Sequence, residues 1–339
     1  MPRTGRRRSD RPGACGSGAM RGGRPAGSGV SHAGHIPNLD CVPVVGGAGE
    51  TIIHRMRTRR PAYRRPQGPS RKGRTMAGKH IGVIGFGNMG GAIISGAIEH
   101  GVVAPADVTI YDPNASAIER VKALGANPAA DEREVIEASD VVLLAVKPQM
   151  FAAAAAKCGS FDGKAILSIM AGVTADRIRE TVEGSPRVMR LMPNTPALVG
   201  AGAFALDADS DFTDEEKTFA KELFESLGIV EFVPEHLLDA VTGLSGSAPA
   251  FVAVFIEALA DGGLLEGLPR ATAYRLAAQT CLGEAKLILD KGMTPAAAKD
   301  MVTSPAGTTI AGYSVLEEAG FRGTVMKAVS AAAQRSREL

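Results

Sequence analysis

Residues 81–90 read Ile-Gly-Val-Ile-Gly-Phe-Gly-Asn-Met-Gly, and this stretch is the strongest indication of the fold. An apolar strand runs directly into a glycine-rich turn, and a helix is predicted to follow from Gly91 to His100. Gly85, Gly87 and Gly90 fit the G-x-G-x-x-G pattern, in which the glycines allow a tight turn, close approach of a pyrophosphate and close helix packing. The alternative is a glycine-rich turn in an α/β protein that binds no nucleotide.

Downstream of this turn, strand-like and helix-like segments alternate, which is typical of a doubly wound parallel sheet. Strands are predicted over 107–111, 140–146, 164–169, 187–192, 201–206 and 229–233. Helices are predicted over 115–124, 131–138 and 174–181, and another begins near Thr213, where Thr213 and Glu216 have the spacing of a capping box. The fold class is therefore α/β, with a dinucleotide-binding Rossmann domain over residues 76–238.

After residue 238 the pattern becomes entirely helical. Helices are predicted over 248–265, 270–290, 295–301, 308–319 and 321–337. The apolar face of residues 248–265 is too wide for a surface helix of a monomer. We therefore expect residues 239–339 to form an all-helical dimerisation and substrate domain; burial of this face inside one subunit is the alternative.

The first 75 residues have a different composition from the rest. They contain 16 Lys and Arg but 3 Asp and Glu, whereas the remainder contains 22 basic and 33 acidic residues. This leader, rich in Arg, Gly and Pro, has no sustained apolar periodicity, so we predict that it is disordered. It lacks the apolar core of a secretion signal, and its Gly and Pro argue against an amphipathic transit helix. Nucleic-acid binding through its arginines is a minor alternative, and a translation start at Met76 is the favoured interpretation.

The composition also bounds the location and the chemistry. Cys15, Cys41, Cys158 and Cys281 include no C-x-x-C pair, and only two lie beyond the leader, which favours a reducing cytoplasm and predicts no metal site. No run of about 18 apolar residues is free of charge, so no membrane span is expected.

Further candidate loops follow the predicted strands, at the edge where doubly wound sheets bind ligands. They are 145–149 (Ala-Val-Lys-Pro-Gln), 192–196 (Met-Pro-Asn-Thr-Pro), the glycine- and serine-rich hinge 241–249, and 302–309 (Val-Thr-Ser-Pro-Ala-Gly-Thr-Thr). The last leads into a helix, so its N–H groups and hydroxyls suit a carboxylate. Rigid turns and a hydroxyl-capped helix start are the alternatives.

At these segments the chain resembles pyrroline-5-carboxylate reductase, a family that reduces a cyclic imine to proline. The resemblance runs from about Lys79 to the end of the chain and includes Gly85–Gly90, Ala145–Pro148, 192–196, 241–247 and Ser304–Thr309. It implies a Rossmann domain, a tight homodimer that commonly assembles into a decamer, and an active site between the cofactor cleft of one subunit and the helical domain of its partner.

The resemblance also implies roles for particular residues. NADPH or NADH would be held by Gly85, Phe86, Gly87, Asn88, Met89, Gly90, Ala145, Val146, Lys147, Pro148, Met170 and Ala171. The substrate, 1-pyrroline-5-carboxylate, and the product, L-proline, would be held by Ser304, Gly307, Thr308 and Thr309. Thr309 matches the threonine proposed in the family to hydrogen-bond or protonate the ring nitrogen. Ala306 stands where the family commonly has glycine, and its extra methyl group puts the fit of this loop in doubt.

For other enzyme classes the motif segments offer one conceivable base, Lys147, and Pro148 after it suggests a backbone role instead. A β-hydroxyacid dehydrogenase needs a positioned base, usually His or Lys, whereas hydride addition to a protonated C=N bond needs only positioning and a neutral hydrogen-bond donor. Beyond the leader the histidines are His80, His100 and His236, and none lies in a motif segment. A β-hydroxyacid dehydrogenase-like enzyme and a non-catalytic dinucleotide-binding regulator remain the runner-up interpretations.

The preference between NADPH and NADH stays open, because Asp112 and the family resemblance favour different cofactors. A carboxylate at the end of the second strand accepts hydrogen bonds from a ribose 2′-hydroxyl and repels a 2′-phosphate, which favours NADH. Asp112 lies 27 positions after Gly85, more than the usual spacing of about 20. The family resemblance favours NADPH instead.

Overall fold

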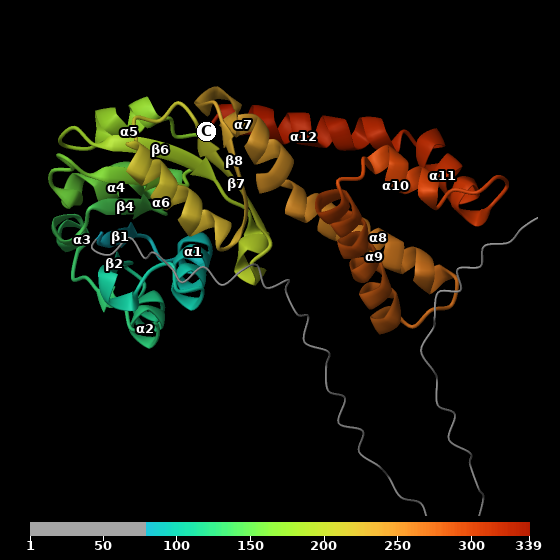
Figure 1. The fold of residues 1–339 in the computed structure, drawn as a ribbon, viewed down its shortest axis with the longest axis horizontal. Helices are drawn as coiled ribbons and strands as arrows, with labels where there is room; N and C mark the ends of the chain where they lie inside the picture. Colours follow the sequence, from blue (N-terminus) through green and yellow to red (C-terminus); the bar gives the residue numbers. More distant parts are fainter. Residues whose placement is uncertain (1–78) are drawn as a thin grey trace, which may run out of the picture. The chain divides into compact units, whose positions relative to one another are not determined.

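The computed structural model describes residues 79–339, so the predictions for the leader and for a domain start at Met76 lie outside the described residues. Within the described part, one eight-stranded sheet has the strand order β3-β2-β1-β4-β5-β6-β7-β8 (Figure 1). The strands are β1 (Ile81–Ile84), β2 (Val108–Tyr111), β3 (Asn127–Pro128), β4 (Val141–Leu144), β5 (Ala165–Ser168), β6 (Arg187–Met192), β7 (Gly202–Asp207) and β8 (Gly228–Val233). The strands from β3 to β6 are parallel, and β7 is antiparallel to β6, so the predicted parallel sheet ends at that pair.

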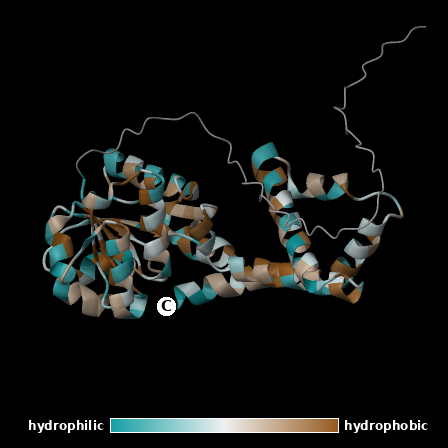
Figure 2. Ribbon diagram, turned by 90° about the horizontal axis from the view of Figure 1, so that it is seen from below, coloured by the Kyte–Doolittle hydropathy of each residue, from teal (hydrophilic) through white to brown (hydrophobic). Residues whose placement is uncertain are grey.

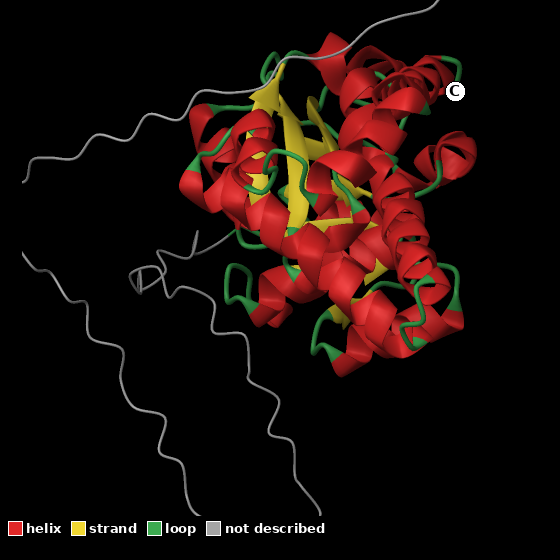
Figure 3. Ribbon diagram, turned by 90° about the vertical axis from the view of Figure 1, so that its right-hand side faces the viewer, coloured by secondary structure: helices red, strands yellow, loops and turns green. Residues whose placement is uncertain are grey.

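Helices lie on both sides of the strands (Figure 3). In the sheet region they are α1 (Asn88–Glu99), α2 (Ala115–Ala123), α3 (Glu132–Ala138), α4 (Pro148–Cys158), α5 (Ala175–Thr181) and α6 (Asp214–Glu225). Successive residues of the central strands alternate between two hydrophobic cores: Val83 and Leu143 belong to one, and Ile84 and Leu144 to the other. Both faces of the sheet are therefore buried, as a parallel sheet requires, and the strands carry hydrophobic colour in Figure 2.

The rest of the chain is helical, as the sequence predicts. Its helices are α7 (Leu238–Val241), α8 (Ala248–Leu265), α9 (Arg270–Lys291), α10 (Pro295–Met301), α11 (Thr308–Glu318) and α12 (Phe321–Arg337). Little of this region is buried within one chain: in α8 only Ala260 is buried, while Val254 is 65% exposed and Leu265 88%. Burial of the apolar face inside one subunit, the alternative considered above, does not occur.

One stretch of this region has the length and composition of a membrane span. It runs from Glu235 to Leu265, and its most apolar 18-residue window has a mean hydropathy of 1.6 and is 6% buried. The expectation of no span rested on charged residues, and Glu257 and Asp261 do lie inside this stretch. Length and composition alone therefore do not separate a membrane helix from a helix that packs against another chain.

Two local predictions are corrected. Helix α1 begins at Asn88, not Gly91, because the turn is completed at Gly87. The segment 241–249 is not an irregular hinge: a π-helical turn, Thr242–Gly246, connects α7 to α8. A Cβ at Gly243 would lie 2.5 Å from the carbonyl oxygen of Val329 in α12, so this glycine serves close helix packing.

Candidate active site

The turn between β1 and α1 has a different constraint at each of its three glycines. Gly85 has φ +97°, and a Cβ there would lie 2.7 Å from the carbonyl oxygen of Ala145. A Cβ at Gly90 would lie 2.5 Å from the carbonyl oxygen of Gly85, which presses the helix against the turn. Around Gly87, by contrast, no atom lies within 4 Å of the Cβ position. Gly85 and Gly90 are thus required because neighbouring backbone leaves no room for a side chain, whereas the space around Gly87 is open.

The first turn of α1 leaves its backbone donors available to an anion. Gly87 is the N-cap, no side chain caps the helix, and no acidic residue lies in its first turn. The N–H groups of a helix start and the helix dipole together attract negative charge. An open glycine at an uncapped helix start therefore suits a pyrophosphate, as the sequence predicts.

Phe86, inside this turn, is held by the side chains of Asp112, which follows β2, and Arg120, which lies in α2. Its N–H donates to Asp112 Oδ2 at 2.7 Å, and its carbonyl oxygen accepts from Arg120 Nη2 at 2.6 Å. The Arg120 guanidinium also lies 5.2 Å from the centre of the Phe86 ring. The other Asp112 oxygen, Oδ1, accepts the N–H of Asn114 at 2.9 Å. Both oxygens of Asp112 thus fix backbone, and each keeps a second lone pair for a ligand.

The unusual spacing of Asp112 does not displace it from the turn. Pro105–Asp107 forms a short 3₁₀ helix ahead of β2, which accommodates the extra residues. Ile84 is paired with Tyr111 in the parallel register, so Asp112 follows its strand directly beside Gly85. Arg120 is the next arginine after Asp112 in the sequence, and its contact with Phe86 spans 34 positions, so no local pattern indicates it.

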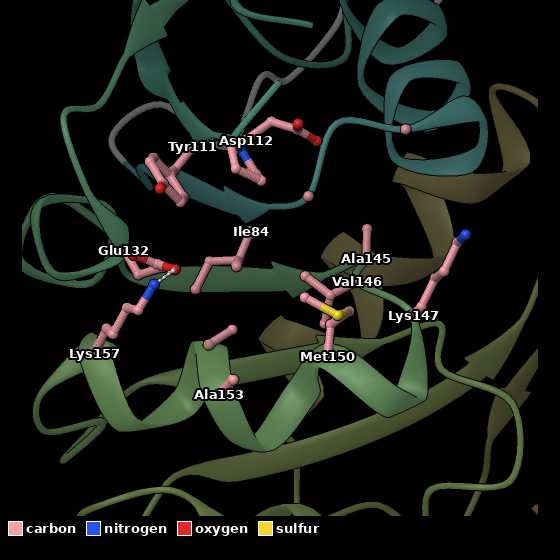
Figure 4. Close-up of a pocket in the computed structure, with 14 residues that line it drawn as sticks. Ile84, Tyr111, Asp112, Glu132, Ala145, Val146, Lys147, Met150, Ala153 and Lys157 are labelled. Atoms are coloured by element: carbon pink, nitrogen blue, oxygen red, sulfur yellow. Dashed lines mark ion pairs between the residues drawn. The ribbon is translucent and has the colours of Figure 1, made fainter. Parts of the chain in front are cut away.

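A pocket of about 500 Å³ opens beside the turn (Figure 4). Six of the predicted cofactor residues line it: Gly85, Gly87, Asp112, Ala145, Val146 and Lys147. Residues that the sequence analysis did not name complete it: Ile84, Tyr111, Pro113, Glu132, Met150, Ala153, Ala154 and Lys157. The lining is mostly apolar, which suits the faces of flat rings between a few polar groups.

Charged side chains lie at the margin of this pocket. Lys157 Nζ lies 3.6 Å from Glu132 Oε1, and the Glu132 side chain is 7% exposed. Figure 4 shows these two side chains pointing toward each other, whereas Lys147 extends away from Val146 and Met150. Pro148, predicted to stiffen a turn, is the first residue of α4, a position that favours proline because it needs no N–H donor.

Other predicted cofactor residues lie beside the pocket without lining it. Phe86, Asn88, Met89 and Gly90 belong to the turn and the first residues of α1, as described above. Met170 is buried, and Ala171 packs against the cluster formed by Met192, Ala205 and Leu238. This pair follows β5, so the same edge of the sheet carries all three predicted cofactor segments.

In the loop 192–196, the residue with an amide side chain has a structural role. Asn194 is buried, and its Oδ1 accepts the N–H of Ala203 at 2.9 Å, which ties the loop to β7. Thr195 begins a 3₁₀ helix, Thr195–Val199. The rigid-turn interpretation of this segment is therefore the one its contacts support.

The predicted substrate residues form the start of α11. Gly307 is the N-cap, its N–H donates to the Ser304 carbonyl oxygen at 3.1 Å, and Thr308 and Thr309 lie in the first turn. Among the described residues other than glycine, Ala306 alone has a positive φ, +56°. Neither an acidic residue nor a side-chain cap occupies this helix start. Ser304, Thr308 and Thr309 are exposed in the single chain.

The single chain does not gather its two candidate sites into one pocket. Every residue that lines the pocket beside the glycine turn lies between Ile84 and Lys157, so the Ser304–Thr309 loop contributes none. No histidine lines it either: His80 Nε2 lies 2.8 Å from Thr109 Oγ1, and His100 Nδ1 lies 2.7 Å from the Gly96 carbonyl oxygen. Within residues 79–339, no cluster of three or more His, Cys, Asp or Glu side chains could hold a metal.

Comparison with known protein families matches both parts of the chain. Residues 80–172 match the family described as NADP oxidoreductase coenzyme F420-dependent, and residues 235–339 match pyrroline-5-carboxylate reductase dimerisation. The solved pyrroline-5-carboxylate reductase of Coxiella burnetii superposes with a TM-score of 0.71 at 32% identity, over 77% of this chain and 98% of that one. The Plasmodium falciparum pyrroline carboxylate reductase, solved with NADP bound, has a TM-score of 0.70 at 29% identity over the same shares.

Curated relatives give the same result at higher identity. Pyrroline-5-carboxylate reductase of Synechocystis is 46% identical over 263 residues, which is 76% of this chain and 97% of the relative. The Escherichia coli enzyme of that name is 41% identical over 267 residues, 77% of this chain and 98% of the relative. The chain belongs to the pyrroline-5-carboxylate reductase family.

Proposed function

We propose that this protein reduces 1-pyrroline-5-carboxylate to L-proline with NADPH or NADH, the last step of proline biosynthesis, in the cytoplasm. As a member of its family it is an oxidoreductase that acts on a C=N bond. The observation that carries the proposal is the open, uncapped helix start at Gly87, in a chain that aligns with reductases of this name over 97–98% of their length.

The residues around the glycine turn fit a dinucleotide. The pyrophosphate would lie against Gly87 and the first N–H groups of α1, where a side chain larger than hydrogen would intrude. Asp112 would face the adenosine ribose, and Ala145 and Val146 would present backbone and apolar surface to the cofactor. When bound, the reduced nicotinamide supplies the hydride that the imine carbon accepts.

The start of α11 fits the other reactant. Its unpaired N–H groups and the hydroxyls of Ser304, Thr308 and Thr309 can hold the substrate carboxylate without a buried charge on the protein. The Thr309 hydroxyl would hydrogen-bond the ring nitrogen, which is already protonated to a large extent near neutral pH. The chain then orients the imine and needs no strong base, consistent with the lack of a histidine at the pocket.

A second copy of the chain would complete this site. Large apolar side chains of α8, α9, α11 and α12 are exposed, among them Val254, Leu289, Val315 and Met326, which are 62–71% exposed. Burial of such a surface in a homodimer is strongly favoured. The match of residues 235–339 to a dimerisation family supports this arrangement. The Ser304–Thr309 loop of one subunit would then face the cofactor pocket of its partner, and dimers would assemble further into a decamer.

The experiment is a steady-state assay of the purified full chain with pyrroline-5-carboxylate, in which loss of nicotinamide absorbance is followed with NADPH and with NADH. We expect turnover with at least one cofactor and formation of stoichiometric L-proline. A parallel assay of a 3-hydroxy acid with the oxidised cofactors should give no turnover. Oxidation of the hydroxy acid without reduction of the imine would overturn the proposal, as would cofactor binding with no turnover of either compound.

A further inference from the structure

The turn after β5, Met170–Gly172, is in contact with residues near the end of α12. Gly172 has φ +73°, and a Cβ there would lie 2.6 Å from Leu339 Cβ and 3.0 Å from the Ser336 carbonyl oxygen. Positions 172 and 339 are far apart in the sequence, so this contact closes a long-range link between the sheet and the helical region. Gly172 is required here for two reasons: its backbone has a positive φ, and the segment Ser336–Leu339 leaves no room for a side chain.

The last turn of α12 is itself anchored. Ser336 is 2% exposed, and its hydroxyl donates to Asp239 Oδ1 of α7 at 2.6 Å. Upstream on the same helix, the carbonyl oxygen of Val329 would lie 2.5 Å from a Cβ placed on Gly243, so the two segments pack closely. The end of α12 is therefore held at two points, by Asp239 of α7 and by Gly243 of the π-helical turn. It forms a fixed surface against the Met170–Gly172 turn.

The other side of the turn is packed as well. Ala171 lies against the apolar cluster of Met192, Ala205 and Leu238, of which Leu238 belongs to α7. Met170 is 2% exposed and its N–H lies 3.4 Å from Ser168 Oγ. The backbone between Met170 and Gly172 is thus bounded by α7 on one side and by the Ser336–Leu339 segment on the other.

We propose that Ser336 and Leu339 are positioning residues: the end of α12 sets the backbone of the Met170–Gly172 turn, through which the helical domain controls cofactor affinity. This inference rests on the proposed function and on the family resemblance, which implies that Met170 and Ala171 of that turn hold the nicotinamide cofactor. Ser336 and Leu339 act through the turn and are not proposed to contact the cofactor or the substrate. The proposal predicts that changes at the end of α12, at Ser336 and Leu339, alter the cofactor KM and leave the KM for the imine unchanged.

A pair of glycine substitutions separates this contact from simple backbone strain. Gly163 has φ +72°, almost the same as Gly172, but no atom lies within 4 Å of its Cβ position. Gly172→Ala and Gly163→Ala therefore introduce the same local strain, and only the first meets α12. We expect Gly172→Ala to raise the cofactor KM about tenfold, with the imine KM unchanged, and Gly163→Ala to leave both near native values. Equal cofactor KM values for the two variants would overturn the proposal.

A double-variant cycle tests the identity of the partner. Leu339→Gly removes the Cβ that the methyl group introduced by Gly172→Ala would meet, so it should offset the effect of Gly172→Ala on cofactor KM at least partly. Because Leu339→Gly also removes support from the turn, alone it should raise the cofactor KM by a few-fold. Strictly additive effects of the two substitutions would show that positions 172 and 339 are not coupled, which would contradict the proposal.

Hydrogen–deuterium exchange gives a readout that does not depend on catalysis. In the native full chain and in Leu339→Gly, exchange is compared for the peptide that contains residues 169–174, with Gly163→Ala as the control. Faster exchange of this peptide in Leu339→Gly alone is expected; unchanged exchange would overturn the positioning role. If the native protein reduces no imine, the proposed function fails, and the exchange experiment still decides whether α12 holds the turn.

Discussion

The N–H of Phe86 donates a 2.7 Å hydrogen bond to Asp112 Oδ2, which joins the glycine-rich turn to the end of the second strand. The sequence predicted Asp112 as a ribose ligand, and the structure gives it a second role as a support for the turn. The same carboxylate thus both shapes the pocket and carries the negative charge that a 2′-phosphate would meet.

Asp112→Asn separates these two roles. The single amide oxygen of asparagine can still accept the Phe86 N–H, although the amide NH2 then replaces the oxygen that accepts from the Asn114 N–H, and the negative charge is gone. Because like charges at a binding site oppose each other, we expect the KM ratio of NADPH to NADH to fall about tenfold. Asp112→Ser, which removes the charge and shortens the side chain, should raise the KM for both cofactors in addition. Steady-state kinetics with each cofactor make the measurement, and an unchanged ratio in both variants would rule out discrimination by charge.

Gly87→Val should abolish cofactor binding and leave the fold intact. No protein atom lies within 4 Å of the Cβ position, and φ is −70°, so the side chain adds no strain. We expect cofactor affinity, measured by nicotinamide fluorescence titration, to fall by at least about 100-fold, with little change in melting temperature. Gly90→Ala is the contrasting variant: its Cβ would lie 2.5 Å from the Gly85 carbonyl oxygen, so it should lower stability. Tight cofactor binding by Gly87→Val would show that the pyrophosphate does not lie against this turn.

Thr309→Ala should lower kcat for the imine and leave cofactor affinity nearly unchanged. The substitution removes a hydroxyl in the first turn of α11 that would face the ring nitrogen. Loss of a hydrogen bond of this kind costs about 10–100-fold in kcat/KM, and Thr309→Ser should retain most of the activity. A fully active alanine variant would exclude Thr309 from the reaction.

Mixed dimers of Gly87→Val and Thr309→Ala test whether the site is shared between subunits. A heterodimer would contain one site with both lesions and one site with neither, so activity should rise above that of either variant when the two impaired proteins are dissociated and reassembled together. If each site lay within one chain, no hybrid would regain activity. The activity of the remixed sample relative to each separately treated variant is the quantity to compare.

Ala306→Gly should stabilise the protein. Ala306 has φ +56°, a left-handed conformation that costs an L-residue with a side chain about 1–2 kcal/mol. Glycine removes that strain but has more freedom when unfolded, so we expect the free energy of unfolding in urea to rise by about 0.5 kcal/mol. Ala311→Gly, in the interior of α11, is the matched control and should lower it by about 1 kcal/mol. Destabilisation by Ala306→Gly would show that the strain is offset by contacts of the methyl group.

The pair Arg187–Glu216 predicts the response to acid. Burial raises the pKa of the Glu216 carboxyl, but hydrogen bonds from Arg187, at 2.7 to 3.2 Å, and from the Thr213 N–H outweigh burial and hold its pKa below the ordinary 4.5. A lowered folded-state pKa means that the pair stabilises the fold above pH 4.5 and loses this contribution as the pH falls below it. Glu216→Gln should therefore cost about 2 kcal/mol at neutral pH.

The measurement for this pair is the urea midpoint of the native protein and of Glu216→Gln at several pH values. The difference between them should shrink as the pH falls from neutral through the range where the carboxyl protonates. Glu222→Gln, at an exposed position of the same helix, is the control. A difference that stays constant at every pH would show that ionisation of Glu216 contributes nothing to stability.

Much of the fold was predictable because its signals are local. Strands such as β4 are continuous apolar runs, and α6 is capped by Thr213 in the predicted capping box, in which Thr213 and Glu216 each accept the other's N–H. Of the elements that were missed, β3 and α4 show two different reasons. Strand β3 spans only Asn127–Pro128, too short for any periodicity, and α4 begins at Pro148, which was interpreted as a turn residue.

The site was less predictable where its geometry depends on tertiary contacts. The glycine spacing located the turn, but nothing in the sequence shows that Arg120 reaches back across 34 positions to the Phe86 carbonyl oxygen. The glycines of 241–249 suggested a hinge because local patterns do not reveal that Gly243 packs under α12. Contacts between distant segments therefore decide the details that local patterns leave open.

A site shared between two subunits is tested most directly by a structure of the assembled protein with NADP⁺ and L-proline bound. We expect the pyrophosphate at Gly87 and the start of α1, and the proline carboxylate at Ser304–Thr309 of the partner subunit. The Thr309 hydroxyl should then lie within hydrogen-bond distance of the ring nitrogen. Proline bound away from this loop, or a nucleotide away from the glycine turn, would contradict the proposed site.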